Sequence, residues 1–194
     1  MPTPSYLQPY IDASRRYGAG FKALLWTSPQ TQAARFDALW RLTGFGNRSV
    51  LDAGCGHADL LEFLGDRGWR GQYAGVEALP ELAQIAEKRT RNIFNGDFLR
   101  QPELLRQNMD VIVFCGSLNT LDRFKFRLAL LNAVRAAREL VAFNFLSSPD
   151  LANAEHLTWH EIDDVAEYAG HIGRDVKWLA DYMTGDCTMK IAVK

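Results

Sequence analysis

A glycine-containing segment at 50–59 holds the residues best suited to approach a nucleotide-like ligand. It reads Val-Leu-Asp-Ala-Gly-Cys-Gly-His-Ala-Asp, in which Asp52, Gly54 and Gly56 follow one another at every second position. Glycine allows a sharp turn out of a strand and lets the backbone come close to a ligand without a β-carbon in the way. An ordinary glycine turn without a ligand is the alternative that this segment alone leaves open.

Two more acidic residues end the next strand-like stretches. Glu77 closes the apolar run 73–77, and its carboxylate is suited to accept hydrogen bonds from both hydroxyls of a ribose. Asp97 lies in Asn-Gly-Asp-Phe at 95–98, and its carboxylate can accept hydrogen bonds. A solvated helix-cap glutamate and a turn-forming aspartate are the alternatives. Ligands of open α/β sheets bind at the carboxyl ends of strands, so acids placed in this order favour one shared site.

A regular alternation of strands and helices must position these residues. Hydrophobic periodicity predicts an amino-terminal helix around 34–42, strands at 49–53, 72–77, 93–97, 109–115 and 140–146, and helices at 58–65, 80–89, 102–107 and 123–139. Such alternation predicts a parallel sheet with helices on both faces. The last two strand-like runs, 175–182 and 187–193, are separated only by 183–186, which predicts a hairpin and therefore an antiparallel strand.

In order along the chain, segments 50–59, 73–80, 95–98 and 110–121 resemble the cofactor motifs of class I, Rossmann-like S-adenosylmethionine-dependent methyltransferases. The first is similar to D/E-x-G-x-G-x-G, with Ala58 in place of the last glycine. The resemblance covers about residues 35–146. It implies an α/β fold with three α/β/α layers and a mostly parallel, seven-stranded Rossmann-like sheet that ends in an antiparallel hairpin strand.

The resemblance also implies S-adenosylmethionine as the cofactor and a set of residues that bind it. These residues are Asp52, Gly54, Cys55, Gly56, Glu77, Ala78, Gly96, Asp97, Phe98, Cys115, Gly116 and Ser117. The expected activity is methyl transfer to an unidentified, small-molecule acceptor. The N/D-P-P-Y/F signature of enzymes that methylate bases or glutamine amides does not occur after the fourth strand. Asn119, which follows that strand, is suited either to orient an acceptor or to cap the next helix.

Two functions of other classes stay open beside methyl transfer. One is a module that binds S-adenosylmethionine as a sensor or scaffold and transfers nothing. The other is an NAD-dependent oxidoreductase, whose G-x-G-x-x-G/A fingerprint would need glycine or alanine at position 59, where Asp59 stands. No catalytic base is named from the sequence, because His57, His160 and Tyr17 are suggested by residue type alone.

Length and composition narrow the setting. The 194 residues, 47% of them hydrophobic, suit a single domain spanning 1–194. A net charge of −1 predicts no nucleic-acid partner. The sequence contains no apolar run of about 18 residues, so no membrane span is expected. Three cysteines without a CxxC pair favour a reduced, cytoplasmic setting. His156 and His160 lack an H-E-x-x-H context, so no metal is expected.

The amino-terminal part, 1–45, is expected to be a helical preamble. Its aromatic residues could form a lid over the active site or could simply pack into the core. They are Tyr6, Tyr10, Tyr17, Phe21 and Trp26.

Overall fold

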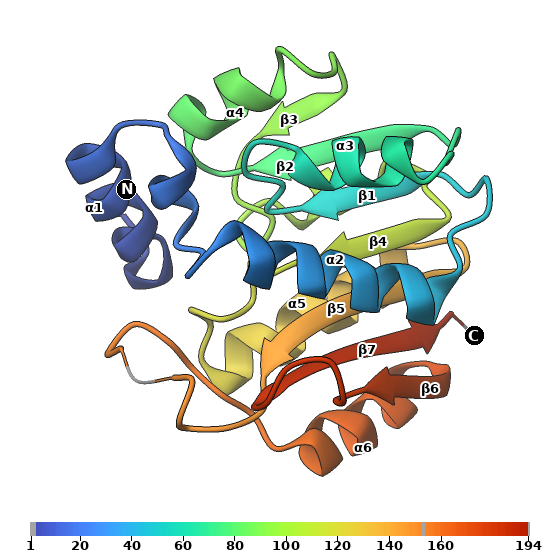
Figure 1. The fold of residues 1–194 in the computed structure, drawn as a ribbon. Helices are drawn as coiled ribbons and strands as arrows, with labels where there is room; N and C mark the ends of the chain where they lie inside the picture. The colour runs from blue at the N-terminus through green and yellow to red at the C-terminus, as the bar shows by residue number, and fades with distance from the viewer. Residues whose placement is uncertain (1–2, 153, 194) are drawn as a thin grey trace.

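A seven-stranded sheet in the order β3-β2-β1-β4-β5-β7-β6 forms the centre of the computed structural model, which describes residues 3–152 and 154–193 (Figure 1). The strands are β1 (Val50–Ala53), β2 (Tyr73–Glu77), β3 (Ile93–Asn95), β4 (Val111–Phe114), β5 (Leu140–Leu146), β6 (Arg174–Leu179) and β7 (Asp186–Ala192). Strand β7 pairs antiparallel with both β5 and β6, whereas the other pairings are parallel. The expected fold class, including the antiparallel hairpin strand, is confirmed.

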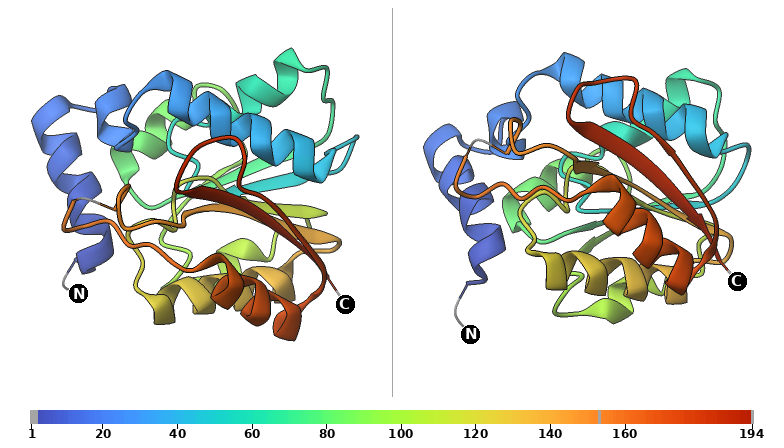
Figure 2. Two further views of the ribbon diagram at one scale, coloured as in Figure 1. Left: turned by 60° about the horizontal axis from the view of Figure 1, so that its bottom comes forward. Right: turned by 90° about the horizontal axis from the view of Figure 1, so that it is seen from below.

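Helices cover both faces of the sheet (Figures 1 and 2). The α-helices are α1 (Gln8–Tyr17), α2 (Pro29–Thr43), α3 (Asp59–Asp66), α4 (Pro80–Ala86), α5 (Arg123–Ala136) and α6 (Ile162–Ile172), and the 3-10 helices are η1 (Ser5–Leu7), η2 (Phe21–Leu24) and η3 (Pro102–Leu105). Side chains of a strand alternate between faces, so Val50 packs with α2 and α3 while Leu51 joins the core beneath α5 and α6.

Several helices have other limits than the sequence predicted. Helix α2 begins earlier, at Pro29, because Ser28 and Thr31 form a capping box there. Helix α5 ends at Ala136, before the expected position 139, because the N–H groups of Arg138 and Glu139 bond to the carbonyls of Met109 and Asp110 and lead the chain into β5. Tertiary hydrogen bonds decide this end, and helical periodicity cannot detect them.

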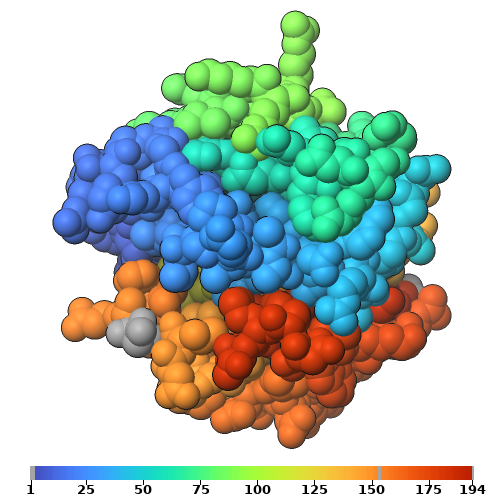
Figure 3. Space-filling view, viewed as in Figure 1, coloured from blue at the N-terminus to red at the C-terminus, as the bar shows by residue number. Residues whose placement is uncertain are grey.

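The amino-terminal segment 3–26 lies against the carboxyl ends of the first strands. Tyr10 and Leu24 pack with Leu79 and Leu82, around the start of α4. In the space-filling view this blue segment forms the left flank of the molecule, next to the green part of the chain (Figure 3). Within the described residues, no helix is long and apolar enough to cross a membrane.

Candidate active site

A cavity lies at the carboxyl ends of β1, β2 and β4, beneath the amino-terminal segment. Its unoccupied space is about 1050 Å³ when the solvent at its mouth is included, which is large enough for a nucleoside-sized ligand. All the cofactor-binding residues predicted from the sequence line it except Gly96. A β-carbon on Gly96 would lie 2.6 Å from Gln101 Oε1 and Leu104 Cδ1, so this glycine serves close packing beside the site.

The glycine turn after β1 uses left-handed backbone at Gly54, Gly56 and Ala58, with φ angles of 79°, 54° and 61°. A β-carbon on Gly54 would lie 2.4 Å from the β-carbon of Ser117, and one on Gly56 would lie 2.7 Å from Leu24 Cδ2. The missing β-carbons therefore make room for the loop after β4 and for the amino-terminal segment. The sequence predicts that these glycines leave space for a ligand. In the directions in which β-carbons at positions 54 and 56 would point, the space is filled by Ser117 and Leu24 instead.

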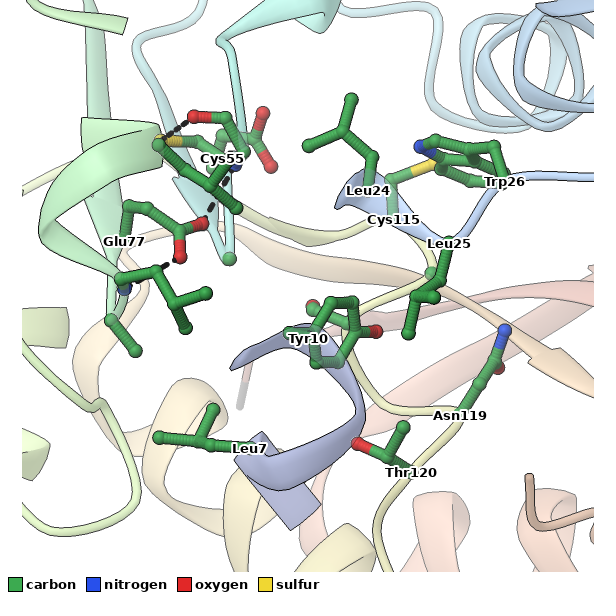
Figure 4. A pocket seen from close by; sticks show the side chains of 18 of the residues that line it. Leu7, Tyr10, Leu24, Leu25, Trp26, Cys55, Glu77, Cys115, Asn119 and Thr120 are labelled. Atoms are coloured by element: carbon green, nitrogen blue, oxygen red, sulfur yellow. Dashed lines mark hydrogen bonds between the residues drawn. The ribbon is translucent and has the colours of Figure 1, made fainter. Parts of the chain in front are cut away.

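Glu77, at the end of β2, joins the glycine turn to the start of α4. Its Oε2 accepts the N–H of Gly56 at 2.8 Å and its Oε1 accepts the N–H of Leu79 at 2.9 Å (Figure 4). Burial raises the pKa of Glu77, while these backbone donors favour its charged form. A carboxylate oxygen has more than one acceptor direction, so Glu77 keeps acceptor capacity for a ligand. Glu77 accepts a backbone N–H at the start of α4, as the helix-cap alternative expected, but its side chain is buried and not solvated.

Asp97 connects the third strand to the amino-terminal segment. Its Oδ2 accepts a hydrogen bond from the hydroxyl of Tyr6 at 2.6 Å, and its Oδ1 accepts the N–H of Leu99 at 2.9 Å. Burial and the neighbouring Asp97 raise the pKa of Tyr6, so the phenol stays protonated and donates. Asp97 is therefore a turn former, as the alternative reading proposed, and it also lines the cavity.

Asp52 is a buried acid with unused acceptor capacity. The hydroxyl of Tyr73 donates to its Oδ2 at 2.8 Å, while its Oδ1 is buried with no hydrogen-bond partner among the described residues. Burial, partly offset by the Tyr73 hydrogen bond, raises the pKa of Asp52 to about 7. An unsatisfied buried oxygen beside a cavity is suited to a donor supplied by a ligand.

A buried ion pair that the sequence analysis missed lies beside the cavity. Arg35 Nε donates to Asp186 Oδ2 at 2.8 Å, and the guanidinium lies 5.1 Å from the ring centre of Trp26. Both charged side chains are almost fully buried. The two residues are 151 positions apart, so no short motif could have signalled the pair.

A chain of hydrogen bonds extends from this ion pair to the cavity wall. Tyr182 donates to Asp186, Thr188 donates to Tyr182 at 2.8 Å, and Asn144 donates to Thr188. At its end, the thiol of Cys115 donates to Asn144 Oδ1 at 2.9 Å. The terminal hairpin is thus tied to helix α2 and to the loop after β4.

The three residues suggested as helpers by type alone lie outside the cavity lining. His57 is buried, and burial lowers its pKa. His160 packs against Phe126 with ring centres 4.2 Å apart, in the segment between β5 and α6. Tyr17 is exposed. Of the amino-terminal aromatic residues, Tyr6, Tyr10 and Trp26 line the cavity, whereas Tyr17 and Phe21 do not.

A family model described as a methyltransferase domain matches residues 27–180, which is most of the chain and includes the whole cavity floor. The chain belongs to the methyltransferase domain family. The match begins at 27, so the part of the lining that comes from segment 3–26 lies outside the matched residues. Asp59 does not fit the nicotinamide fingerprint, β7 is antiparallel, and the family match is to methyltransferases, so the nicotinamide alternative is left without support.

This methyltransferase domain has relatives in sequence and in structure. It is 33% identical over 109 residues to Rv1506c of Mycobacterium tuberculosis, a protein whose methyltransferase assignment is itself provisional; the match covers 52% of this chain and 64% of that protein. The magnesium protoporphyrin IX methyltransferase of Synechocystis PCC 6803, solved with bound SAH, shares the fold with a TM-score of 0.65 at 15% identity, over 95% of this chain and 94% of that chain.

An S-adenosylmethionine-dependent methyltransferase of Clostridium acetobutylicum also shares the fold. The TM-score is 0.64 at 14% identity, and the match covers 95% of this chain and 98% of that chain.

Proposed function

We propose that this chain is an S-adenosylmethionine-dependent methyltransferase acting on a small-molecule acceptor. The observation that carries the proposal is the row of acids at successive strand ends, Asp52, Glu77 and Asp97, all lining one cavity in a methyltransferase-family fold. The relative from Synechocystis holds SAH, the demethylated form of this donor. A cytoplasmic location is part of the same proposal.

The residues present suit the donor. Glu77 has acceptor directions left for the ribose hydroxyls, and we assign the adenine amino group to a remaining acceptor direction of Asp97, which also accepts from Tyr6 and Leu99. The unpartnered Oδ1 of Asp52 is available to a donor group of the ligand. We assign the methionine end to the glycine turn and to Cys115, Gly116 and Ser117, which line the cavity after β4.

When bound, S-adenosylmethionine would supply a methyl group activated by its sulfonium charge, for transfer to a lone pair of the acceptor. The protein's contribution is to align the acceptor and to exclude water. Among the described residues that line the cavity, Tyr10 and Cys115 are the ionisable groups nearest the end away from the acids that could act as a base. Burial raises the pKa of both, to about 12 for Tyr10, which the charge of Glu77 also raises, so both stay protonated at neutral pH. Positioning therefore carries most of the catalytic effect.

Segment 3–26 is proposed as a lid. Its Tyr6 bonds to Asp97 and its Leu24 packs on Gly56, so it closes the cavity over the residues assigned to the donor. The same coverage favours the second candidate, a module that binds S-adenosylmethionine without methyl transfer, if the lid also excludes an acceptor.

Calorimetry with SAH, S-adenosylmethionine and NAD tests the binding part. We expect SAH and S-adenosylmethionine to bind in the micromolar range or below, and NAD not to bind. Incubation of a metabolite extract with donor carrying a labelled methyl group then tests transfer. Label in a small molecule supports the enzyme, binding without any transfer supports the sensor, and absence of binding at millimolar SAH contradicts both.

A further inference from the structure

We propose that the end of the cavity away from the acids receives a neutral, largely apolar acceptor molecule, whose hydroxyl or amine group donates a hydrogen bond to Asn119 Oδ1. This inference rests on the proposed methyltransferase function, because it assigns the molecule to be methylated. It makes Asn119 a specificity-determining residue.

The two ends of the cavity differ in chemistry (Figure 4). Glu77 and Cys55 lie on one side, and Asn119 and Thr120 lie on the other, with the ring of Tyr10 between them. Away from the acids the lining is mostly apolar. Its apolar members include Leu25, Trp26, Leu121 and Leu157. Burial of apolar ligand surface against these side chains would supply most of the affinity.

The charge at this end excludes an anionic acceptor. Among the described residues that line the cavity, Arg35 is the one cation, and its charge is already balanced by the buried Asp186. Gln32, which also lines the cavity, donates its amide to Asp59. A carboxylate or phosphate on the acceptor would therefore lose its hydration without meeting an unpaired positive side chain of the protein, which is unfavourable. A neutral molecule does not incur this loss.

Asn119 supplies the polar contact that such a site needs. Its Oδ1 is buried and has no hydrogen-bond partner among the described residues, although the residue lines the cavity. A buried acceptor without a partner destabilises the protein, and a ligand that donates to it recovers that loss. A hydroxyl or amine hydrogen fits this oxygen, whereas a methylated oxygen has no hydrogen to donate.

The structure removes the alternative role of Asn119 as a helix cap. Helix α5 is capped by Asp122, whose side chain accepts the N–H of Lys125 at 2.9 Å. The backbone of Asn119 is instead held from two sides, because its carbonyl accepts the N–H of Thr158 at 2.7 Å and the Thr158 hydroxyl at 3.1 Å, while its own N–H donates to Gly116 at 3.3 Å. A fixed backbone with a free carboxamide suits ligand recognition.

Three small probes test this proposal on the wild-type protein saturated with SAH. They are 4-ethylphenol, which donates a hydrogen bond, 4-ethylanisole, in which a methyl group caps the oxygen, and 4-ethylbenzoate, which is an anion. Calorimetry or ligand-observed NMR gives their affinities. We expect 4-ethylphenol to bind about five times more tightly than 4-ethylanisole or better, and 4-ethylbenzoate to bind most weakly.

Two variants locate the discriminating group. Asn119→Leu removes the acceptor at similar volume, and Thr120→Val is a matched control that removes a hydroxyl from the neighbouring lining residue. We expect Asn119→Leu to reduce the preference for the phenol to less than about twofold with SAH affinity unchanged, and Thr120→Val to keep the preference.

Results on the wild type alone can overturn the proposal, so it does not depend on how the variants fold. Equal binding of phenol and anisole, tightest binding of the benzoate, or no binding of any probe at millimolar concentration while SAH binds would each overturn it. Loss of the preference in Thr120→Val but not in Asn119→Leu would overturn the role of Asn119. Failure of SAH itself to bind would instead overturn the proposed function on which the inference rests.

Discussion

Glu77 Oε2 accepts a hydrogen bond from the N–H of Gly56 at 2.8 Å, so the acid at the end of β2 stabilises the glycine turn that follows β1. The same carboxylate accepts the N–H of Leu79 at the start of α4. One buried side chain therefore joins the end of β2 and the start of α4 to a turn 21 positions earlier in the chain. Any change at Glu77 must affect the shape of the site as well as its contacts with a ligand.

Replacement of Glu77 by alanine or glutamine is expected to lower both stability and SAH affinity. Two buried N–H groups lose a charged acceptor in Glu77→Ala, which costs about 1 to 3 kcal/mol of folding free energy. Lost ribose contacts weaken SAH binding by a similar 1 to 3 kcal/mol. Chemical denaturation and calorimetry measure the two losses. Glu87→Gln, on the exposed end of α4, is the control, and normal SAH affinity in a folded Glu77→Ala protein would contradict the assignment.

Tyr6→Phe is expected to loosen the proposed lid. The change removes the hydrogen bond to Asp97, which contributes about 0.5 to 2 kcal/mol, so dissociation of SAH should accelerate about 2- to 30-fold. Hydrogen exchange should also speed up over residues 3–24. Tyr17→Phe removes an exposed hydroxyl from the same segment and should change neither measurement. An unchanged dissociation rate in Tyr6→Phe would mean that the segment does not cover bound SAH.

Gly56→Ala is expected to displace the amino-terminal segment, because the new β-carbon would lie 2.7 Å from Leu24 Cδ2. Leu24→Ala in the same chain should restore part of the lost stability by removing that contact, although the cost of a left-handed alanine, about 1 kcal/mol, remains. Gly54→Ala meets the Ser117 β-carbon, so Leu24→Ala should not rescue it. Thermal unfolding of the single and double variants decides the point. Equal rescue of both glycine variants would exclude a specific contact between Leu24 and position 56.

The pKa of about 7 at Asp52 predicts a pH dependence of the ligand-free protein. An aspartate has a pKa near 3.9 when unfolded, so the folded state binds the extra proton between about pH 4 and pH 7. The contribution of Asp52 to the free energy of unfolding is therefore largest below about pH 4. It is lost as the pH rises through 7, by at most about 4 kcal/mol. Asp52→Asn should flatten this part of the curve.

Urea unfolding at pH 4, 5.5, 7 and 8 measures this dependence. Asp37→Asn, an intermediate-exposure residue of α2, is the control that should keep the wild-type slope. If the difference between wild type and Asp52→Asn does not change with pH, the raised pKa of Asp52 is wrong.

Breaking the ion pair of Arg35 with Asp186 is expected to be strongly destabilising. Arg35→Met or Asp186→Leu leaves a buried charge without its partner, which typically costs about 3 to 5 kcal/mol. The double variant should lose much less than the sum, because no charge remains buried. A double-mutant cycle by urea denaturation measures the coupling, and additive losses would show that the pair contributes nothing specific.

The sequence by itself determined the order of strands and helices along the chain and the positions of the acids at the strand ends. Short, mostly apolar runs without alternation mark β1, β2 and β4, and a short connection before 187 requires a hairpin; these are local properties of neighbouring residues. From that order alone, Asp52, Glu77 and Asp97 could be placed on one edge of the sheet. Their role in binding S-adenosylmethionine stays a prediction.

Only the tertiary structure decided which side chains these residues meet. Tyr6 on Asp97, Leu24 over Gly56 and Arg35 with Asp186 each join parts of the chain that no periodicity relates. Likewise, Asp122 caps α5, so Asn119 is not the cap and lines the cavity instead. Such contacts depend on how complete layers pack, and packing is a property of the whole fold that local sequence preference does not contain.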